Sequence, residues 1–335
     1  MPVANSTSNY LAPIEVNASK VRQKDLHLLA DIVELACLKS IDHETTIEEA
    51  LDEQLGENEG IGGIVETEPN PDAESSYFAP AVRNDRQATR LRDIQAHLLA
   101  RNDLFGDSYP FANDDGFIKL KENPSTQHKL YAFMLLSSHL SFLPRTDVCK
   151  FTADFEIAAA FALKRFFPNW TLKVVGTAHC AHLQSYAGTP RRKLENFAQD
   201  LGLKLLIEEE ELQRYQTPNG DAGLDVVAWH PFNDGAPHMP VFLAQVGCTD
   251  DESQMFIKPY SASPQRWGNK LRGLSAIGCM VTPQCYRNAR NSWPCFTDVN
   301  SVFIDRARVL SLLTAAEDFQ FNYLQTHLAV ESTVS

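Results

Sequence analysis

Several familiar patterns are missing from this chain of 335 residues. No apolar run reaches the roughly 18 residues that a membrane-spanning helix needs. The N-terminus "MPVANSTSNYLAPIEV" lacks the basic region followed by an apolar region that marks a secretory signal. The seven cysteines are an odd number and form no C-x₂-C pair. Together these absences predict a cytoplasmic protein with free thiols and no membrane association.

Common catalytic motifs are also missing, since the chain has no P-loop, no G-x-G-x-x-G and no H-E-x-x-H. Two weaker groupings stay open. His179, Cys180 and His182 could join later cysteines at a zinc ion, although no C-x₂-C spacing supports it. Cys248 and His230 could act as nucleophile and base, although no third group is identifiable.

Lys and Arg are absent between Asp42 and Glu74, where 12 acidic residues occur. Because the whole chain carries a net charge of −13, the remainder is close to neutral. Composition therefore neither favours nor excludes a nucleic-acid partner. The later part of the stretch, "GENEGIGGIVETEPNPDAESS", predicts a mobile spacer that folding does not require. The earlier part, "TTIEEALDEQL", is compatible with a helix capped at Thr45 or Thr46.

The pattern along the chain predicts a mixed α/β protein with a helical N-terminal accessory region. Apolar residues at helical spacing predict a helix over residues 22–40. Further along, the pattern predicts a helix, a hairpin turning at Asp114-Asp115-Gly116 and a second helix. This order suits either a winged-helix-like module or a helical lid. The predicted order is an N-terminal helix (1–40), an acidic flexible linker (41–82), the helical accessory region (83–148), an α/β domain (149–310) and a C-terminal helix and tail (311–335).

The stretch "GDAGLDVVAWHPFNDGAPHMPVFLAQVGC" places two apolar, strand-like runs around a segment of turn residues. A hairpin centred on Gly235 would set Asp225 opposite Gln245 and Gly223 opposite Gly247. An acid and an amide held that close could bind one hard cation. In the simpler alternative, Asp225 caps a turn and Gln245 bonds to backbone.

These residues resemble the nuclease core of the PD-(D/E)XK restriction-endonuclease-like superfamily, and the nearest pattern is the Mrr-like branch with G-D-x-G-x-D followed by Q-x-K. The resemblance covers roughly residues 150–300. It implies a three-layer α/β/α fold that cuts DNA with Mg²⁺ or Mn²⁺. Asp225 matches the metal-binding acid, Gln245 the second ligand and Asp221 the leading Asp of the pattern. Glu156, in "DFEIAAAF", matches a helical Glu that often completes the metal site.

The chain departs from this pattern where the family carries a lysine on the second strand, because the residue there is Gly247. That lysine orients the attacking water and stabilises charge on the phosphate. Some members carry it on the neighbouring helix instead. From helical spacing in "QRWGNKLRGL", Lys270 is the first candidate for a replacement, and Lys258 is the second.

Taken together, the sequence predicts an Mg²⁺-dependent endonuclease acting on nucleic acid, most simply double-stranded DNA. Family resemblance suggests a role in bacterial defence against phage. Arg191, Arg192 and Lys193, at the start of a predicted helix, would contact phosphate. The alternative is an inactive nuclease-like fold that binds nucleic acid or serves as a structural subunit, and either form could have a protein partner or form a homo-oligomer.

Overall fold

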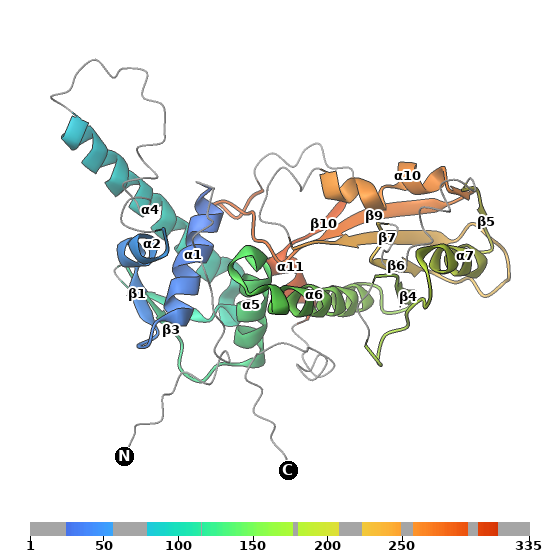
Figure 1. Ribbon diagram of the computed structural model, residues 1–335, viewed down its shortest axis with the longest axis horizontal. Helices are drawn as coiled ribbons and strands as arrows, with labels where there is room; N and C mark the ends of the chain where they lie inside the picture. The colour runs from blue at the N-terminus through green and yellow to red at the C-terminus, as the bar shows by residue number, and fades with distance from the viewer. Residues whose placement is uncertain are drawn as a thin grey trace, which may run out of the picture. The chain divides into compact units, whose positions relative to one another are not determined.

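A computed structural model describes residues 25–55, 79–114, 116–176, 180–207, 223–248, 257–293 and 301–313 (Figure 1). The chain divides into two compact units. Among the described residues, the first unit contains 25–145 and 285–293, and the second contains 146–284 and 301–313. No helix in these ranges is both long enough and apolar enough to cross a membrane.

The first unit joins helices to a small antiparallel sheet whose strand order is β1-β3-β2. The predicted hairpin is confirmed, because β2 and β3 pair antiparallel with Asp114 opposite Phe117. The elements are α1 Leu26–Lys39, β1 Glu44–Thr46, α2 Ile47–Leu55, α4 Ala79–Phe105, η2 Gly106–Ser108, β2 Phe111–Asp114, β3 Phe117–Leu120, α5 Thr126–Ser137 and η3 Leu140–Phe142.

Part of the predicted flexible linker is folded. Residues 44–55 form β1 and α2, and Leu51 is fully buried in the unit. Thr46 caps α2, because its Oγ1 accepts a hydrogen bond of 3.1 Å from the Glu49 amide. The helix capped at Thr45 or Thr46 that the sequence allowed here is therefore confirmed, with Thr46 as the cap. The flexible linker predicted over 41–82 is wrong for 44–55, where three apolar residues at helical spacing outweigh the acidic ones. Residues 56–78 lie outside the described part of the chain.

The interior of the first unit holds a network of buried charges. Arg101 on α4 lies 2.6 Å from the Asp31 carboxylate and 2.9 Å from that of Glu34, both on α1. The hydroxyls of Tyr109 and Tyr131 donate to Glu34 over 2.9 and 2.8 Å. Removing one member of such a network leaves a buried charge without compensation, which typically costs about 3–5 kcal/mol. The network therefore fixes how α1, α4 and α5 pack.

The second unit contains a five-stranded mixed sheet with the order β10-β9-β7-β6-β4. Strand β6 pairs antiparallel with both β4 and β7, whereas β9 pairs parallel with both β7 and β10. The elements are α6 Arg145–Phe166, β4 Thr171–Val174, α7 Pro190–Asp200, β5 Lys204–Leu205, β6 Val226–Trp229, β7 Pro240–Val246, η4 Lys258–Ala262, α10 Pro264–Gly268, β8 Leu271–Arg272, β9 Ser275–Val281, β10 Val302–Ile304 and α11 Arg306–Leu312. The predicted mixed α/β class is confirmed.

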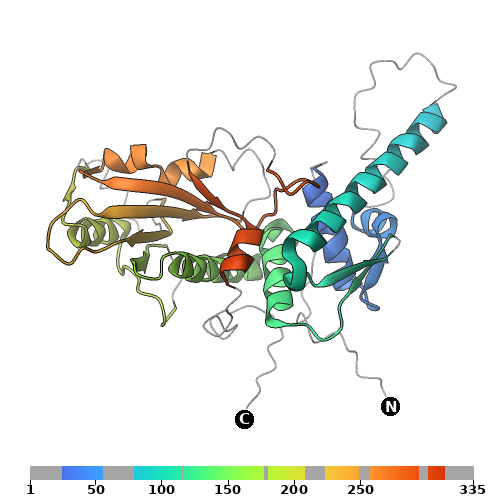
Figure 2. The same cartoon turned by 180° about the vertical axis from the view of Figure 1, so that it is seen from behind.

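Helices lie on both faces of this sheet. Figures 1 and 2 show α6 along one face, with η4 and α10 along the other. On the face of η4 and α10, Trp267 and Phe197 pack with Val227 and Leu243 of the central strands. The central strands are apolar on both faces because both are covered. This arrangement leaves the ends of the strands as the places where polar groups can gather.

Candidate functional site

The hairpin of β6 and β7 has the predicted register. Val226 pairs with Ala244 and Val227 with Leu243, which centres the hairpin on Gly235. One residue further, the Asp225 amide donates to the Ala244 carbonyl over 3.0 Å. Asp225 and Gln245 therefore lie opposite one another at the end of the strand pair.

The two side chains are in direct contact. Gln245 Nε2 donates to Asp225 Oδ2 over 2.5 Å, and the Val246 amide donates to the same oxygen over 2.6 Å. Asp225 is buried, with 5% of its surface exposed. Burying a carboxylate is costly unless donors or a cation compensate it. The simpler alternative holds in one respect, since Gln245 Nε2 also donates to the backbone carbonyl of Val246 over 3.4 Å, but its shorter hydrogen bond is to the acid itself.

The Glu156 carboxyl lies near the end of strand β4, in the space beside Gly176. The amides of Val175 and Gly176, just past β4, both donate to the backbone carbonyl of Asp225, over 2.7 and 3.1 Å. A Cβ atom on Gly176 would overlap the carboxyl group of Glu156. The absent side chain is thus what allows the Glu156 carboxylate, which is 6% exposed, to lie next to the residues that hold Asp225.

Lys258 occupies the space left by the missing strand lysine. Its Nζ lies 3.2 Å, and its Cδ 3.1 Å, from where a Cβ atom on Gly247 would be. Met280 approaches the same point to 2.8 Å. The position that a side chain on residue 247 would take is therefore occupied in part by a lysine from η4.

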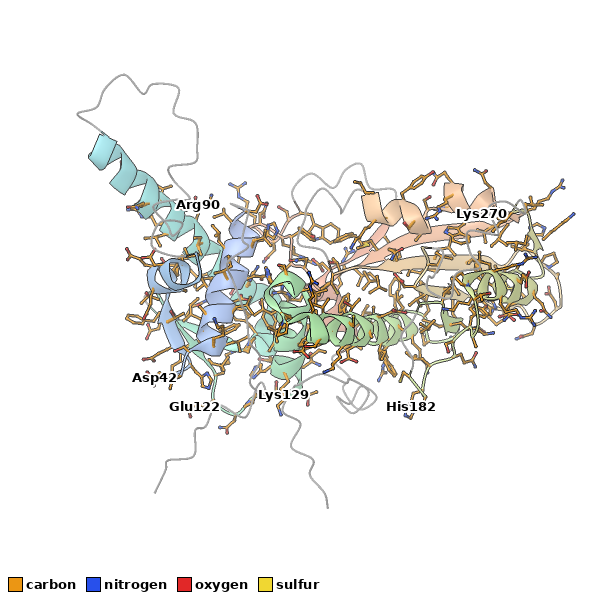
Figure 3. All side chains as sticks on the ribbon, in the orientation of Figure 1. Asp42, Arg90, Glu122, Lys129, His182 and Lys270 are labelled. Atoms are coloured by element: carbon orange, nitrogen blue, oxygen red, sulfur yellow. The ribbon has the colours of Figure 1, made fainter. Side chains whose placement is uncertain are left out.

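Lys270 lies elsewhere. The strand that follows it, β8, pairs with β5, and β9 then begins at Ser275 opposite Pro240, the first residue of β7. Gln245 is near the last residue of β7, so Lys270 is at the other end of the sheet. Figure 3 shows Lys270 beside α10, toward β5. The helical spacing that suggested Lys270 is also interrupted, because α10 ends at Gly268.

The pairing of Cys248 with His230 is not formed. Cys248 follows the end of β7, whereas His230 follows the end of β6, and antiparallel pairing places these positions at opposite ends of the hairpin. Burial raises the pKa of the Cys248 thiol to about 12, with Lys258 acting in the opposite direction, so the thiolate nucleophile is disfavoured. For zinc, His179 falls outside the described residues.

The three basic residues of α7 differ in their surroundings. Arg191 and Arg192 are partly and largely exposed, and both pair with Glu195, at 3.0 and 3.8 Å. Lys193 is buried, and its Nζ donates to the carbonyls of Val175 and Gly176 over 2.5 and 3.0 Å. Lys193 therefore does not share the surface on which a phosphate contact was predicted.

The groups around Asp225 suit a hard divalent cation in their chemistry. The carboxylates of Asp225 and Glu156 are oxygen donors of the kind Mg²⁺ and Mn²⁺ prefer, and a half-turn of the Gln245 amide would present a third oxygen. The space beside Gly176, which holds the Glu156 carboxyl, supports the binding of such a cation. Within the described ranges no cluster of three His, Cys, Asp or Glu residues suits a metal. Asp221 lies outside those ranges.

Comparison with known proteins adds no relative. No family model, curated protein or solved structure matches this chain. The function is therefore argued from the geometry of the site.

Gly176 was not foreseen from sequence, and Lys193 was expected in another role. Gly176 follows an ordinary strand, and Lys193 was grouped with its charged neighbours. The one available signal for Lys193 is its spacing, since it lies one position before Leu194 and four before Phe197, both buried on the same helix.

Proposed function

We propose that this protein is a metal-dependent endonuclease with a restriction-endonuclease-like core. The observation that carries the proposal is the opposed pair Asp225 and Gln245, with Lys258 over Gly247 at the same strand end. The order of elements agrees with a three-layer core of this kind: α6, the antiparallel strands β4, β6 and β7, then η4 and α10, and β9 parallel to β7.

Each residue has a role that follows from its position. Asp225, Glu156 and Gln245 would hold Mg²⁺ or Mn²⁺, and the ion would lower the pKa of a bound water and neutralise the scissile phosphate. Lys258 would place a donor beside the developing negative charge. The Asp225 carboxylate is kept in place by the Val246 amide and by its own backbone pairing, so its orientation is set before substrate arrives.

The surroundings suit an anionic substrate. Between Ile257 and Gln284 the chain has four Lys or Arg residues and no Asp or Glu, and its first part, η4 and α10, covers one face of the sheet. Arg191 and Arg192 on α7 remain candidates for phosphate contact, which would compete with their pairing to Glu195. The first unit would serve as an accessory module that recognises DNA or a partner protein.

A cleavage assay with a matched pair of variants tests the proposal. The purified chain should degrade plasmid DNA with Mg²⁺ or Mn²⁺ and not with EDTA. Asp225→Asn should reduce the rate by about 10²–10³, the cost typical of losing one preorganised charged group. Asp234→Asn, in the exposed loop of the same hairpin, should cleave like wild type. Equal rates for the two variants would reject the assigned site.

A second candidate is a nuclease-like protein that binds nucleic acid without cutting it. It is favoured by the neutral amide of Gln245 and because, within the described ranges, no group of three His, Cys, Asp or Glu residues is arranged to hold a metal ion. In that case the wild-type chain would bind DNA at low salt, with no cleavage at any concentration of Mn²⁺.

A further inference from the structure

The two residues after β4, Val175 and Gly176, connect three parts of the candidate site. Their amides donate to the Asp225 carbonyl, and the space beside Gly176 holds the Glu156 carboxyl. Their carbonyls accept from Lys193 Nζ over 2.5 and 3.0 Å. This short segment therefore touches both proposed metal-binding acids and one buried lysine.

The carbonyls of Val175 and Gly176 need a donor from outside the sheet. Strand β4 is the last strand of its sheet, and its ladder to β6 ends at Val174. A buried carbonyl without a donor costs about 1–3 kcal/mol. Lys193 is only 7% exposed and supplies the donor to both. Lys193 lies on α7, which follows β4 and precedes β6 along the chain.

We infer that Lys193 is a positioning residue, which fixes the Val175–Gly176 backbone so that Glu156 and Asp225 face one metal ion. This inference rests on the proposed nuclease function. The hydrogen bonds of Lys193 described above are to these two backbone carbonyls. Lys193 acts through the backbone, because a shift at Gly176 would fill the space that holds the Glu156 carboxyl. The same shift would weaken the hydrogen bonds from the two amides to the Asp225 carbonyl.

The test compares Lys193→Met with Lys173→Met in the full chain. Lys173 on β4 also links this strand to α7, through Asp200 at 2.6 Å, but lies away from Gly176. Hydrogen exchange of the Val175 and Gly176 amides, followed by NMR without metal, reports the backbone directly. Calorimetric titration with Mn²⁺ reports the assembled acids. Lys193→Arg, which keeps N–H donors, is the conservative variant.

We expect Lys193→Met to exchange these two amides at least tenfold faster and to bind Mn²⁺ at least tenfold more weakly. Lys193→Arg should recover part of both losses, and Lys173→Met should match wild type in both. If Lys193→Met matches wild type while wild type binds Mn²⁺, the positioning role is overturned and the nuclease proposal stands. If wild type binds no Mn²⁺, the metal-dependent nuclease is overturned, and the positioning role with it. Should Lys193→Met not fold, Lys193→Gln takes its place in both measurements, and values equal to those of Lys173→Met would reject the role.

Discussion

Lys258 and Lys270 belong to one basic segment, yet their side chains meet different surroundings. Lys258 lies over Gly247, at the end of β7 that carries Gln245. Lys270 is 9% exposed and lies 5.9 Å from the ring centre of Trp267, near the opposite end of the sheet. The difference separates a lysine at the strand end of Asp225 from one that packs against a buried tryptophan.

The first prediction concerns these two residues. Lys258→Met should lower the cleavage rate by about 10²–10³ and leave Mn²⁺ and DNA binding in place, because it removes a donor for the developing charge. Lys270→Met should keep the wild-type rate per folded molecule. Single-turnover cleavage, with binding measured separately by titration, distinguishes the two. A larger loss in Lys270→Met would return the role to that residue.

At this scale the sequence predicts what lies within one hairpin and fails for what approaches it from elsewhere. Asp225 and Gln245 were paired correctly because turn residues and two apolar runs define the register. The choice between Lys258 and Lys270 depended on where η4 and α10 lie over the sheet. Spacing along the chain does not show how close either lysine comes to Gln245.

Among the elements, α2 shows how an acidic surface can hide a packed helix. Glu48, Glu49 and Asp52 give the segment the composition of a spacer, while Ile47, Ala50 and Leu51 face inward and are buried. Composition averages over both faces, whereas packing depends on one. The flexible linker predicted over 41–82 failed in its first part for this reason.

The second prediction tests the packing of α2. Leu51→Ala should destabilise the first unit by about 2–5 kcal/mol, since Leu51 is fully buried. Asp52→Ala, the exposed neighbour, should change stability by less than about 0.5 kcal/mol. Urea unfolding with hydrogen exchange in α1 as the local probe measures both. Equal effects from the two variants would mean that α2 is not part of the core.

For the molecule as a whole, the buried charges of the first unit make stability depend on pH. Burial lowers the pKa of His27 to about 3 and that of His97 to about 4, with Asp31 and Arg101 acting in opposite directions on both. Both histidines are therefore neutral when folded, whereas unfolded histidine has a pKa of about 6.5. Below pH 6.5 the unfolded chain binds the extra protons, so stability falls with pH down to the folded-state values.

The third prediction follows from this sign. Between pH 6.5 and 4, each of the two histidines should remove up to about 1.4 kcal/mol of stability per pH unit. His27→Phe should reduce the loss of stability per pH unit by the contribution of one histidine. Urea unfolding at pH 7, 6 and 5 gives the slopes. An identical slope in His27→Phe would show that His27 does not carry the effect.

The hairpin register also determines the order in which the site can be assembled. Asp225 and Gln245 are 20 residues apart, so their contact closes a short loop, whereas Glu156 joins from far earlier in the chain. Local contacts form readily during folding, and distant ones must first overcome a larger loop-closure entropy. A chain still folding would thus hold the acid–amide pair before it holds Glu156. If the protein cuts nucleic acid, its cleavage activity would then arise only after the second unit has closed around α6.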